Sequence, residues 1–278
     1  MNPQVQLDRD ALAEFCRKWR IRELSIFGSA IRDDFGPESD LDFLVSFEPG
    51  TRLDMCDLLD MKEELVVDTD YDKGFYDTIT AGSEQSASVL VPYYLDDLFE
   101  NTIRSVVDIG CGRGVWGKEF QNQGCEVLGV DGAYVTDPVI PFMAHDLREP
   151  LMLDKRYDLA VCLEVAEHLP EGSADTLIQS LVDASDIVLF SAAIPYQTGH
   201  GHINCQWPSY WARKFHSHGY VVEDYRQEYW ADPRIEPWYA QNMLLFVKNE
   251  LLVAETDAES LNFGVLEMVH PTIHGWGR

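Results

Sequence analysis

The sequence lacks the features that mark secreted and membrane proteins. Its six cysteines are dispersed and form no C-x-x-C pair, which argues against a disulfide framework or a structural zinc site. No basic segment precedes an apolar stretch near the N-terminus, and no run reaches the roughly 18 apolar residues that a membrane span needs. We therefore expect a soluble, cytoplasmic protein with no signal peptide and no membrane partner.

Positive charge is also scarce. Lys and Arg total 21 against 48 Asp and Glu, which gives a formal net charge of -27. Such a surface repels the phosphate backbone of nucleic acids, so we expect no nucleic-acid partner. Because 46% of the 278 residues are hydrophobic, the chain can build a sizeable core, in one large domain or two unequal ones.

The pattern of apolar residues divides the chain into three segments. A helical spacing followed by two strand-like runs indicates a small α+β module at the start, and the polar stretch 68–72 follows it. Beyond this stretch, strand-like runs alternate with helical ones, which is typical of a mostly parallel sheet with helices on both faces. These runs are 105–109, 126–130, 157–163, 186–191, 220–225 and 243–247. We predict domains over 1–68 and 69–250, with a C-terminal extension over 251–278.

A glycine-rich turn follows the first of these strands. It reads Asp108-Ile109-Gly110-Cys111-Gly112-Arg113-Gly114. Glycines permit a sharp turn and the close approach of a ligand, and the helix that follows offers free N–H groups. Asp131 comes 21 positions after Gly110 and follows the next strand, where its carboxylate can accept hydrogen bonds from ribose hydroxyls. The turn therefore predicts a cofactor that contains a nucleoside.

A nicotinamide dinucleotide is the first alternative, because Gly112, Gly114 and Gly117 also spell G-x-G-x-x-G. That register begins late and leaves Asp108 and Gly110 without a role. An acid just before the first glycine suits a cationic amino-acid head group better than a pyrophosphate. A glycine-rich turn without any ligand is the second alternative.

The turn resembles motif I of class I S-adenosylmethionine-dependent methyltransferases. The resemblance continues through Ala144-His145-Asp146-Leu147, where the family's Asp commonly faces the adenine amino group, and through 157–169, which is similar to the fourth strand and following loop of that fold. It covers 69–250 and implies a Rossmann-like, mostly parallel seven-stranded sheet. It also implies cofactor contacts from Asp108, Gly110, Gly112, Gly114, Asp131, Asp146, Leu147 and Glu164.

The acceptor loop, 194–207, follows the expected fifth strand. Ligands in open α/β sheets bind beyond the carboxyl ends of the strands, so this loop should face the cofactor's methyl group. His202 or His200 is the candidate general base, since histidine accepts protons near neutral pH. Candidates for acceptor binding are Asn204, Gln206, Trp207 and, before the loop, His168.

Two other interpretations of the same region stay open. The loop histidines could simply cap the helix that begins at Pro208, and Glu164, Glu167 and His168 could form exposed ion pairs. A metal site built from His200, His202 and Cys205 is less favoured, because it lacks a fourth ligand.

The N-terminal module carries a second motif. Gly28-Ser29 and, nine residues later, Ser39-Asp40-Leu41-Asp42 resemble the signature of minimal nucleotidyltransferases of the polymerase-β-like superfamily. Alternate strand positions place Asp40 and Asp42 on one face, and Mg²⁺ prefers such oxygen ligands. The resemblance implies Mg²⁺ at these two residues if the module is active. Asp68 is the only candidate for the family's third carboxylate, so we interpret 1–68 as a truncated, degenerate or regulatory module.

Three functional hypotheses follow. The first is a methyltransferase that methylates an oxygen of a small polar acceptor, such as a sugar or a natural-product intermediate. The second places the activity in the N-terminal nucleotidyltransferase-like module, with the rest of the chain as a cofactor-binding or accessory domain. The third is a non-catalytic acidic module that binds the cofactor as a signal. The sequence identifies neither the acceptor nor the oligomeric state.

Overall fold

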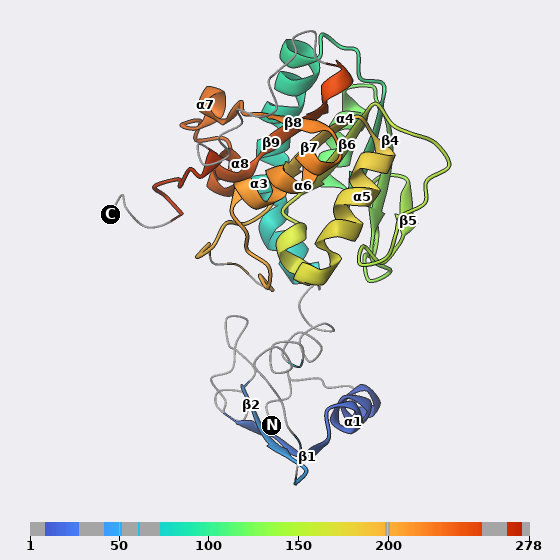
Figure 1. Cartoon of the computed structure of the whole chain (residues 1–278), viewed down its shortest axis with the longest axis vertical. Helices are drawn as coiled ribbons and strands as arrows, with labels where there is room; N and C mark the ends of the chain where they lie inside the picture. The colour runs from blue at the N-terminus through green and yellow to red at the C-terminus, as the bar shows by residue number, and fades with distance from the viewer. Residues whose placement is uncertain are drawn as a thin grey trace. The chain divides into compact units, whose positions relative to one another are not determined.

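The computed structural model describes residues 9–27, 42–49, 51, 61, 73–197, 199, 201–251 and 266–273. The chain divides into two compact units, Met1–Asp70 and Tyr71–Arg278, which are drawn in Figure 1. The sequence predicted this boundary at 68/69, within the same polar stretch.

The first unit contains a helix and a two-stranded sheet in its described part. Helix α1 spans Arg9–Lys18, and strands β1 (Ile21–Phe27) and β2 (Asp42–Phe47) pair in antiparallel fashion. Phe15, Ile21 and Met61 are buried together, with Trp19 and Val45 packed against them. The small α+β module predicted from the sequence is therefore present in this part of the chain.

The second unit is built on a seven-stranded sheet in the order β5-β4-β3-β6-β7-β9-β8. The strands β3 to β7 are mutually parallel where they pair, and β9 runs antiparallel to both β7 and β8. The strands are β3 (Ser105–Ile109), β4 (Glu126–Asp131), β5 (Phe142–Ala144), β6 (Leu159–Leu163), β7 (Ile187–Ser191), β8 (Tyr220–Glu223) and β9 (Leu244–Lys248). This confirms the Rossmann-like, mostly parallel seven-stranded sheet.

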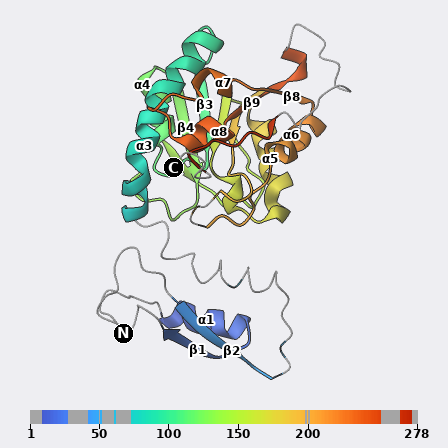
Figure 2. The same cartoon turned by 90° about the vertical axis from the view of Figure 1, so that its left-hand side faces the viewer.

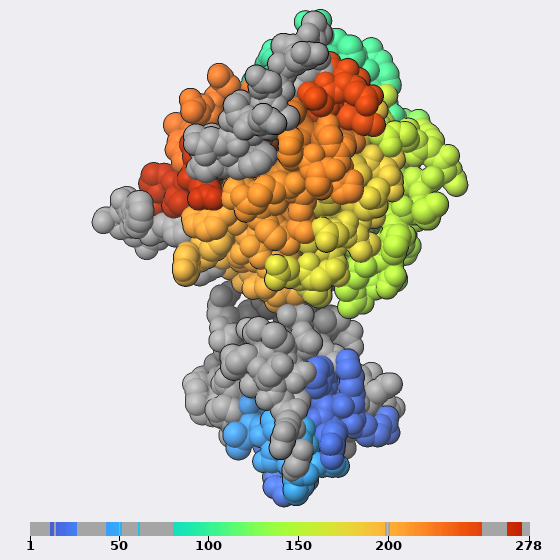
Figure 3. All heavy atoms as spheres, viewed as in Figure 1, coloured from blue at the N-terminus to red at the C-terminus, as the bar shows by residue number. Residues whose placement is uncertain are grey.

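Helices cover both faces of this sheet. Figure 2 shows α3 (Lys73–Pro92) and α4 (Val115–Asn122) on one side, with α5 (Ala174–Ala184) and α6 (Pro208–Ser217) on the other. On the face seen in Figure 3, α5 and α6 form neighbouring parts of the surface, and Lys214 of α6 pairs with Asp175 of α5. The remaining helical segments are a π-helix, Tyr93–Leu98, the short α-helices α7 (Arg226–Tyr229) and α8 (Pro237–Asn242), and 3-10 turns at Ala166–His168, Glu171–Ser173 and Asn249–Leu251.

The alternation of side chains along the buried strands produces two cores. In β3, Val107 and Ile109 pack toward α5 and α6, whereas Val106 packs with α3 and α4 residues such as Leu90 and Phe120. Residues facing both ways are apolar because both faces of the sheet are covered. The sheet is therefore fixed from both sides, and its strand ends are held in defined positions.

The described C-terminal residues belong to the second unit. Leu266 is buried in the core beneath α6, and its carbonyl accepts a hydrogen bond from Nη2 of the fully buried Arg226 at 2.9 Å. Among the described residues, no helix has the length and apolar character that a membrane crossing requires.

Candidate functional site

Polar side chains gather at the carboxyl edge of the parallel strands. Asp131 ends β4, Glu164 directly follows β6, and the loop after β7 carries His202. Because β4, β3, β6 and β7 are neighbours and run in one direction, the segments that follow them meet at the same edge. This edge is the candidate functional site.

The turn after β3 brings bare backbone to this edge. Gly110 and Gly114 have φ angles of +81° and +92°, which L side chains rarely adopt. A Cβ on Gly110 would lie 2.3 Å from Cγ2 of Val165, so no larger residue fits without displacing the next loop. Gly112 lies between them, also at positive φ, and Gly114 caps α4. Val165 and Ile140 pack closely against Gly110 and Gly114, so the turn brings bare backbone against the next segments, with the first N–H groups of α4 beside it.

Asp131 is 5% exposed and already accepts hydrogen bonds within the chain. Its Oδ2 accepts from the backbone N–H of Gly112 at 2.7 Å, and its Oδ1 accepts from the N–H of Gly132 at 2.6 Å. The hydroxyl of Tyr134 donates to the same Oδ1 at 2.5 Å. A hydroxyl therefore already occupies one acceptor position of the carboxylate, where a ribose hydroxyl would be expected to bind.

Asp108 is 4% exposed, and its Oδ2 accepts a hydrogen bond from the N–H of Gly117 in α4 at 3.1 Å. Burial raises the pKa of Asp108 to about 7, and the nearby charge of Asp131 adds to this effect, while the Gly117 hydrogen bond opposes it. Burial likewise raises the pKa of Asp131. Two desolvated carboxyls beside the glycine turn favour a cationic ligand, because a positive charge stabilises their ionised forms.

The segment after β5 holds Asp146 and Leu147. Asp146 forms an ion pair with Arg148 at 2.7 Å, and hydrogen bonds from Arg148 lower the pKa of Asp146 to about 2. Leu147 is 9% exposed and packs in the core. The backbone N–H of His145 donates to the carbonyl of Asp131 at 2.7 Å, which joins this segment to the end of β4.

Glu164 is held by two amide side chains that the sequence analysis did not identify. Its φ of +54° is unusual for a non-glycine residue. Nδ2 of Asn242 donates to Oε1 at 3.1 Å, and Nε2 of Gln197 donates to Oε2 at 3.3 Å. Gln241 donates to both amide oxygens, those of Gln197 and Asn242, at 2.9 Å. The signal in the sequence for Asn242 was the polar pair Gln241-Asn242 at the end of α8, just before the buried strand β9.

Glu167, His168 and His202 form a cluster at the centre of the edge. One potential ligand atom from each of the three residues lies within 4.8 Å of the other two. Glu167 is fully buried, and neither of its carboxylate oxygens makes a hydrogen bond of good geometry among the residues that the structure describes, although the N–H groups of Glu167 and Ala193 and the carboxyl of Glu164 lie near them. Burial raises the pKa of Glu167 well above its usual value, and the neighbouring Glu164 adds to the shift. Sequence reasoning noted Glu167 but gave it no role of its own.

The other predicted acceptor residues lie on the same loop. Asn204 is 4% exposed, and its Nδ2 donates to the carbonyl of Ala166 at 3.4 Å. Its Oδ1 accepts from Nε2 of Gln206 at 3.0 Å, and the partly buried Trp207 caps α6. His200 lies outside the described residues, as do Asp40, Ser39 and Gly28-Ser29 of the N-terminal motif. Asp42 begins β2 and is paired with Phe27 of β1.

Two models of known domain families match the chain. A methyltransferase domain model matches residues 85–191, and a nucleotidyltransferase domain model matches residues 9–105. Among curated proteins, the ubiquinone biosynthesis O-methyltransferase of Yersinia enterocolitica is 28% identical over 103 residues, 32% of this chain. The corresponding enzyme of Yersinia pestis is 27% identical over the same length. The match spans 42% of the length of each of these relatives.

Solved methyltransferase structures are also similar to the chain. One is magnesium protoporphyrin IX methyltransferase from Synechocystis with bound SAH, at 18% identity and a TM-score of 0.43, covering 59% of this chain and 82% of that one. Another is CalS10, an amino pentose methyltransferase from Micromonospora echinaspora, at 13% identity and a TM-score of 0.48, covering 62% and 96%. The matched domain and the sequence motifs agree: residues 85–191 match a methyltransferase domain, and residues 9–105 match nucleotidyltransferase domains.

Proposed function

We propose that this chain transfers the methyl group of S-adenosylmethionine to an oxygen of a small polar acceptor. The observation that supports this most is the pair of buried carboxyls, Asp108 and Asp131, on either side of the glycine turn after β3. In this proposal Asp131 accepts hydrogen bonds from the ribose, and Asp108 faces the cationic methionine end. Gly110, Gly112 and Gly114 offer bare backbone to that end, and Asp146 with Leu147 borders the adenine.

The acceptor binds between the segment after β6 and the loop after β7. The bound cofactor supplies an electrophilic methyl carbon, so the protein has to place the acceptor oxygen in line with it and exclude water. Asn204 and Gln206 shape the loop, Trp207 borders it, and His168 and His202 face the acceptor oxygen. His202 is the candidate for taking the acceptor's proton. The names of the curated relatives, O-methyltransferases, support oxygen as the accepting atom.

Cofactor binding by matched aspartate variants tests the proposal. Asp131→Asn should weaken S-adenosylmethionine binding by about 1–3 kcal/mol in calorimetry, because ribose hydroxyls lose a charged acceptor. Asp158→Asn is the control. Asp158 accepts hydrogen bonds from the N–H groups of Arg104 and Ser105 at the opposite end of β3, so its variant should bind the cofactor normally. Unchanged binding in Asp131→Asn would remove this residue from the site.

Turnover separates an enzyme from a cofactor-sensing module. The full chain, supplied with S-adenosylmethionine and a small-molecule extract, should produce S-adenosylhomocysteine and a methylated acceptor. A protein that binds the cofactor tightly but yields neither product with any acceptor would instead support the signalling hypothesis.

Nucleotidyl transfer by the N-terminal module is the second candidate function. It is supported by the match of residues 9–105 and by the pairing of Asp42 with Phe27, the residue before Gly28. In this candidate Asp40 and Asp42 hold Mg²⁺. Radiolabel transfer from a nucleoside triphosphate that is lost in the Asp40→Ala/Asp42→Ala variant would support it, and absence of transfer by the natural chain would argue against it.

A further inference from the structure

We propose that Glu167, His168 and His202 together bind one divalent transition-metal ion at the carboxyl edge of the sheet. Two imidazoles and one carboxylate are a ligand set that suits Mn²⁺, Fe²⁺, Co²⁺ or Zn²⁺ better than Mg²⁺. Their ligand atoms lie within 4.8 Å of one another. Ligand atoms around one tetrahedral ion lie about 3.4 Å apart, so closure around it requires side-chain movements of up to about 1 Å.

The first argument concerns Glu167. Its side chain is fully buried, and neither carboxylate oxygen makes a hydrogen bond of good geometry in the described part of the chain, although the backbone N–H groups of Glu167 and Ala193 and the carboxyl of Glu164 lie near it. A buried carboxyl with such weak donors is costly, and a bound cation is one arrangement that satisfies it. Glu164, whose carboxylate lies close enough to act on Glu167, adds a second negative charge beside the cluster. The site therefore has a surplus of acceptors that a cation would balance.

The second argument concerns the orientation of the two histidines. Nδ1 of His168 lies 3.1 Å from the carbonyl oxygen of Gly201, and Nδ1 of His202 lies 3.2 Å from that of Gln197. A carbonyl oxygen can only accept, so each Nδ1 carries the proton and each Nε2 carries the lone pair in the neutral ring. Metal-bound histidines are usually fixed in this way, with the second ring nitrogen donating to a carbonyl or a carboxylate.

The third argument concerns the backbone that supports the ligands. The N–H groups of Ile203 and Asn204 both donate to the carbonyl of Glu167, at 2.8 and 3.0 Å. The loop after β7 is therefore tied to the segment after β6 at the residue that supplies the carboxylate. Both segments begin at the ends of adjacent parallel strands, β6 and β7. The three ligands thus come from a fixed part of the fold.

The function of the ion rests on the methyl transfer proposed above. Three protein ligands leave coordination positions open for an acceptor hydroxyl, and coordination lowers the pKa of that hydroxyl. The hydroxyl releases its proton to solvent, its oxygen forms a bond to the methyl carbon, and the carbon–sulfur bond of the cofactor breaks. The products are a methyl ether, S-adenosylhomocysteine and one proton. His202 is then a metal ligand rather than the general base that the sequence suggested.

Direct metal binding tests the proposal without any acceptor. The full chain, without a histidine tag and in an Asp40→Ala/Asp42→Ala background to remove the N-terminal carboxylates, is stripped with a chelator and titrated with Mn²⁺ under electron paramagnetic resonance. We expect one bound Mn²⁺ per chain, weakened about tenfold or more in Glu167→Gln, His168→Gln and His202→Gln. Repeating the titration with Co²⁺ should give the visible absorption of a nitrogen-ligated ion. His218→Gln, at an exposed histidine outside the cluster, is the matched control.

Two outcomes would overturn the proposal: a chain that binds neither Mn²⁺ nor Co²⁺, or cluster variants that bind them as tightly as His218→Gln does. Calorimetric titration with S-adenosylmethionine is carried out on every variant. If cofactor binding persists while metal binding is absent, the metal proposal fails and the methyltransferase proposal stands. If the unsubstituted chain does not bind S-adenosylmethionine, the methyltransferase proposal is contradicted instead.

Discussion

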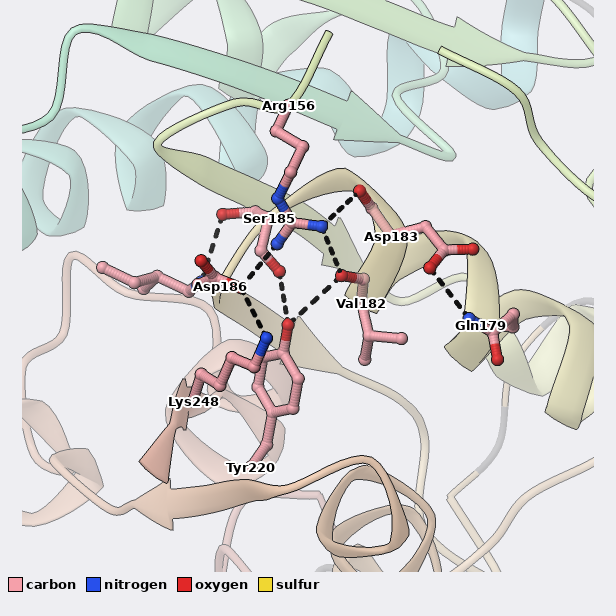
Figure 4. Close-up of polar contacts among 9 residues, drawn as sticks. Arg156, Gln179, Val182, Asp183, Ser185, Asp186, Tyr220 and Lys248 are labelled. Atoms are coloured by element: carbon pink, nitrogen blue, oxygen red, sulfur yellow. Dashed lines mark hydrogen bonds and ion pairs between the residues drawn. The ribbon is translucent and has the colours of Figure 1, made fainter. Parts of the chain in front are cut away.

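Polar groups at the two edges of the seven-stranded sheet differ in how well their hydrogen bonds are satisfied. At the amino edge, Figure 4 shows Arg156 and Tyr220 converging on the end of α5. Nη1 of Arg156 donates to the carbonyls of Val182 and Asp183 at 3.1 and 2.7 Å, and the Tyr220 hydroxyl donates to that of Ser185 at 2.6 Å. At the carboxyl edge, the buried Glu167 makes no hydrogen bond of good geometry among the described residues, and burial raises the pKa of Asp108 to about 7.

The amino edge contributes to stability, whereas the carboxyl edge is suited to binding a ligand. The last carbonyls of a helix need donors, and the amino edge supplies them from side chains, which lowers the free energy of the folded state. Buried carboxyls with few donors raise that free energy, so the carboxyl edge is destabilised in the free protein. Perturbed carboxyls of this kind gather at binding sites, where a ligand compensates them.

Gly110→Ala should produce the largest effect. An alanine at φ +81° is strained by about 1–2 kcal/mol, and its Cβ would clash with Val165. We expect a loss of about 2–5 kcal/mol in the free energy of unfolding, together with loss of cofactor binding. Gly124→Ala is the control, because its φ is +94° but its Cβ would meet no atom within 4 Å. In chemical denaturation, Gly110→Ala should lose more unfolding free energy than Gly124→Ala, because only the first variant has the clash. Equal losses would contradict the close approach of Val165 to Gly110.

Tyr220→Phe should destabilise the protein by about 1–2 kcal/mol without changing cofactor affinity. The buried hydroxyl donates to the carbonyls of Ser185 and Val182, which would lose a donor. Tyr134→Phe removes a hydroxyl at the opposite edge. This change frees the acceptor position on Oδ1 of Asp131 that the hydroxyl occupies. We expect this second variant to bind S-adenosylmethionine at least as well as the natural chain. Thermal unfolding and calorimetry check both, and weaker cofactor binding in Tyr134→Phe would contradict the account of Asp131.

Cofactor affinity should rise with pH up to about 7 and then level off. Asp108 has its pKa raised to about 7 by burial, so below that value binding of the cationic cofactor must first release a proton. Cofactor affinity should rise at most about tenfold per pH unit, and Asp108→Asn should remove most of this pH dependence. The raised pKa also means that the native state holds this proton more tightly than the unfolded one. Asp108 therefore contributes a loss of stability as pH rises from about 4 to 7.

Glu167→Gln should have the smallest effect on stability and should not be destabilising in metal-free protein. Replacing a buried carboxyl that has only weak hydrogen bonds relieves a desolvation cost, and Gln keeps its size. Asp158→Asn gives the opposite result at the amino edge, because Asp158 accepts three hydrogen bonds from Arg104 and Ser105. If Glu167→Gln unfolds at a lower temperature than the Asp158 variant, the contrast between the edges does not hold.

Much of the fold could be predicted from local patterns. The apolar runs predicted six of the seven strands of the large sheet, and the helical spacing at the start predicted α1. Strand β5, Phe142–Ala144, was not predicted from its residues, because it has three residues, is only partly buried and directly follows Pro141. Its pairing with β4 depends on the neighbouring strand rather than on its own sequence.

The candidate site could be predicted only where its residues are close in sequence. The glycine turn and Asp131 follow from strand and turn signals, but the cluster of Glu167, His168 and His202 joins segments 34 residues apart. From the sequence, His202 is predicted as a general base, and the metal site considered there, with His200 and Cys205, is the less favoured alternative. Gln197, from the same loop as His202, and Asn242, from the end of α8, hold Glu164. Such contacts arise from the packing of strand ends, which spacing along the chain does not reveal.

A crystal structure of the full chain grown with S-adenosylhomocysteine and Mn²⁺ tests the central claim most directly. The account predicts the nucleoside in the turn after β3, with its ribose hydroxyls hydrogen-bonded to Asp131 in place of the Tyr134 hydroxyl. It also predicts Mn²⁺ on Glu167, His168 and His202. A turn filled by protein side chains, or the nucleoside bound at any other edge of the sheet, would contradict it.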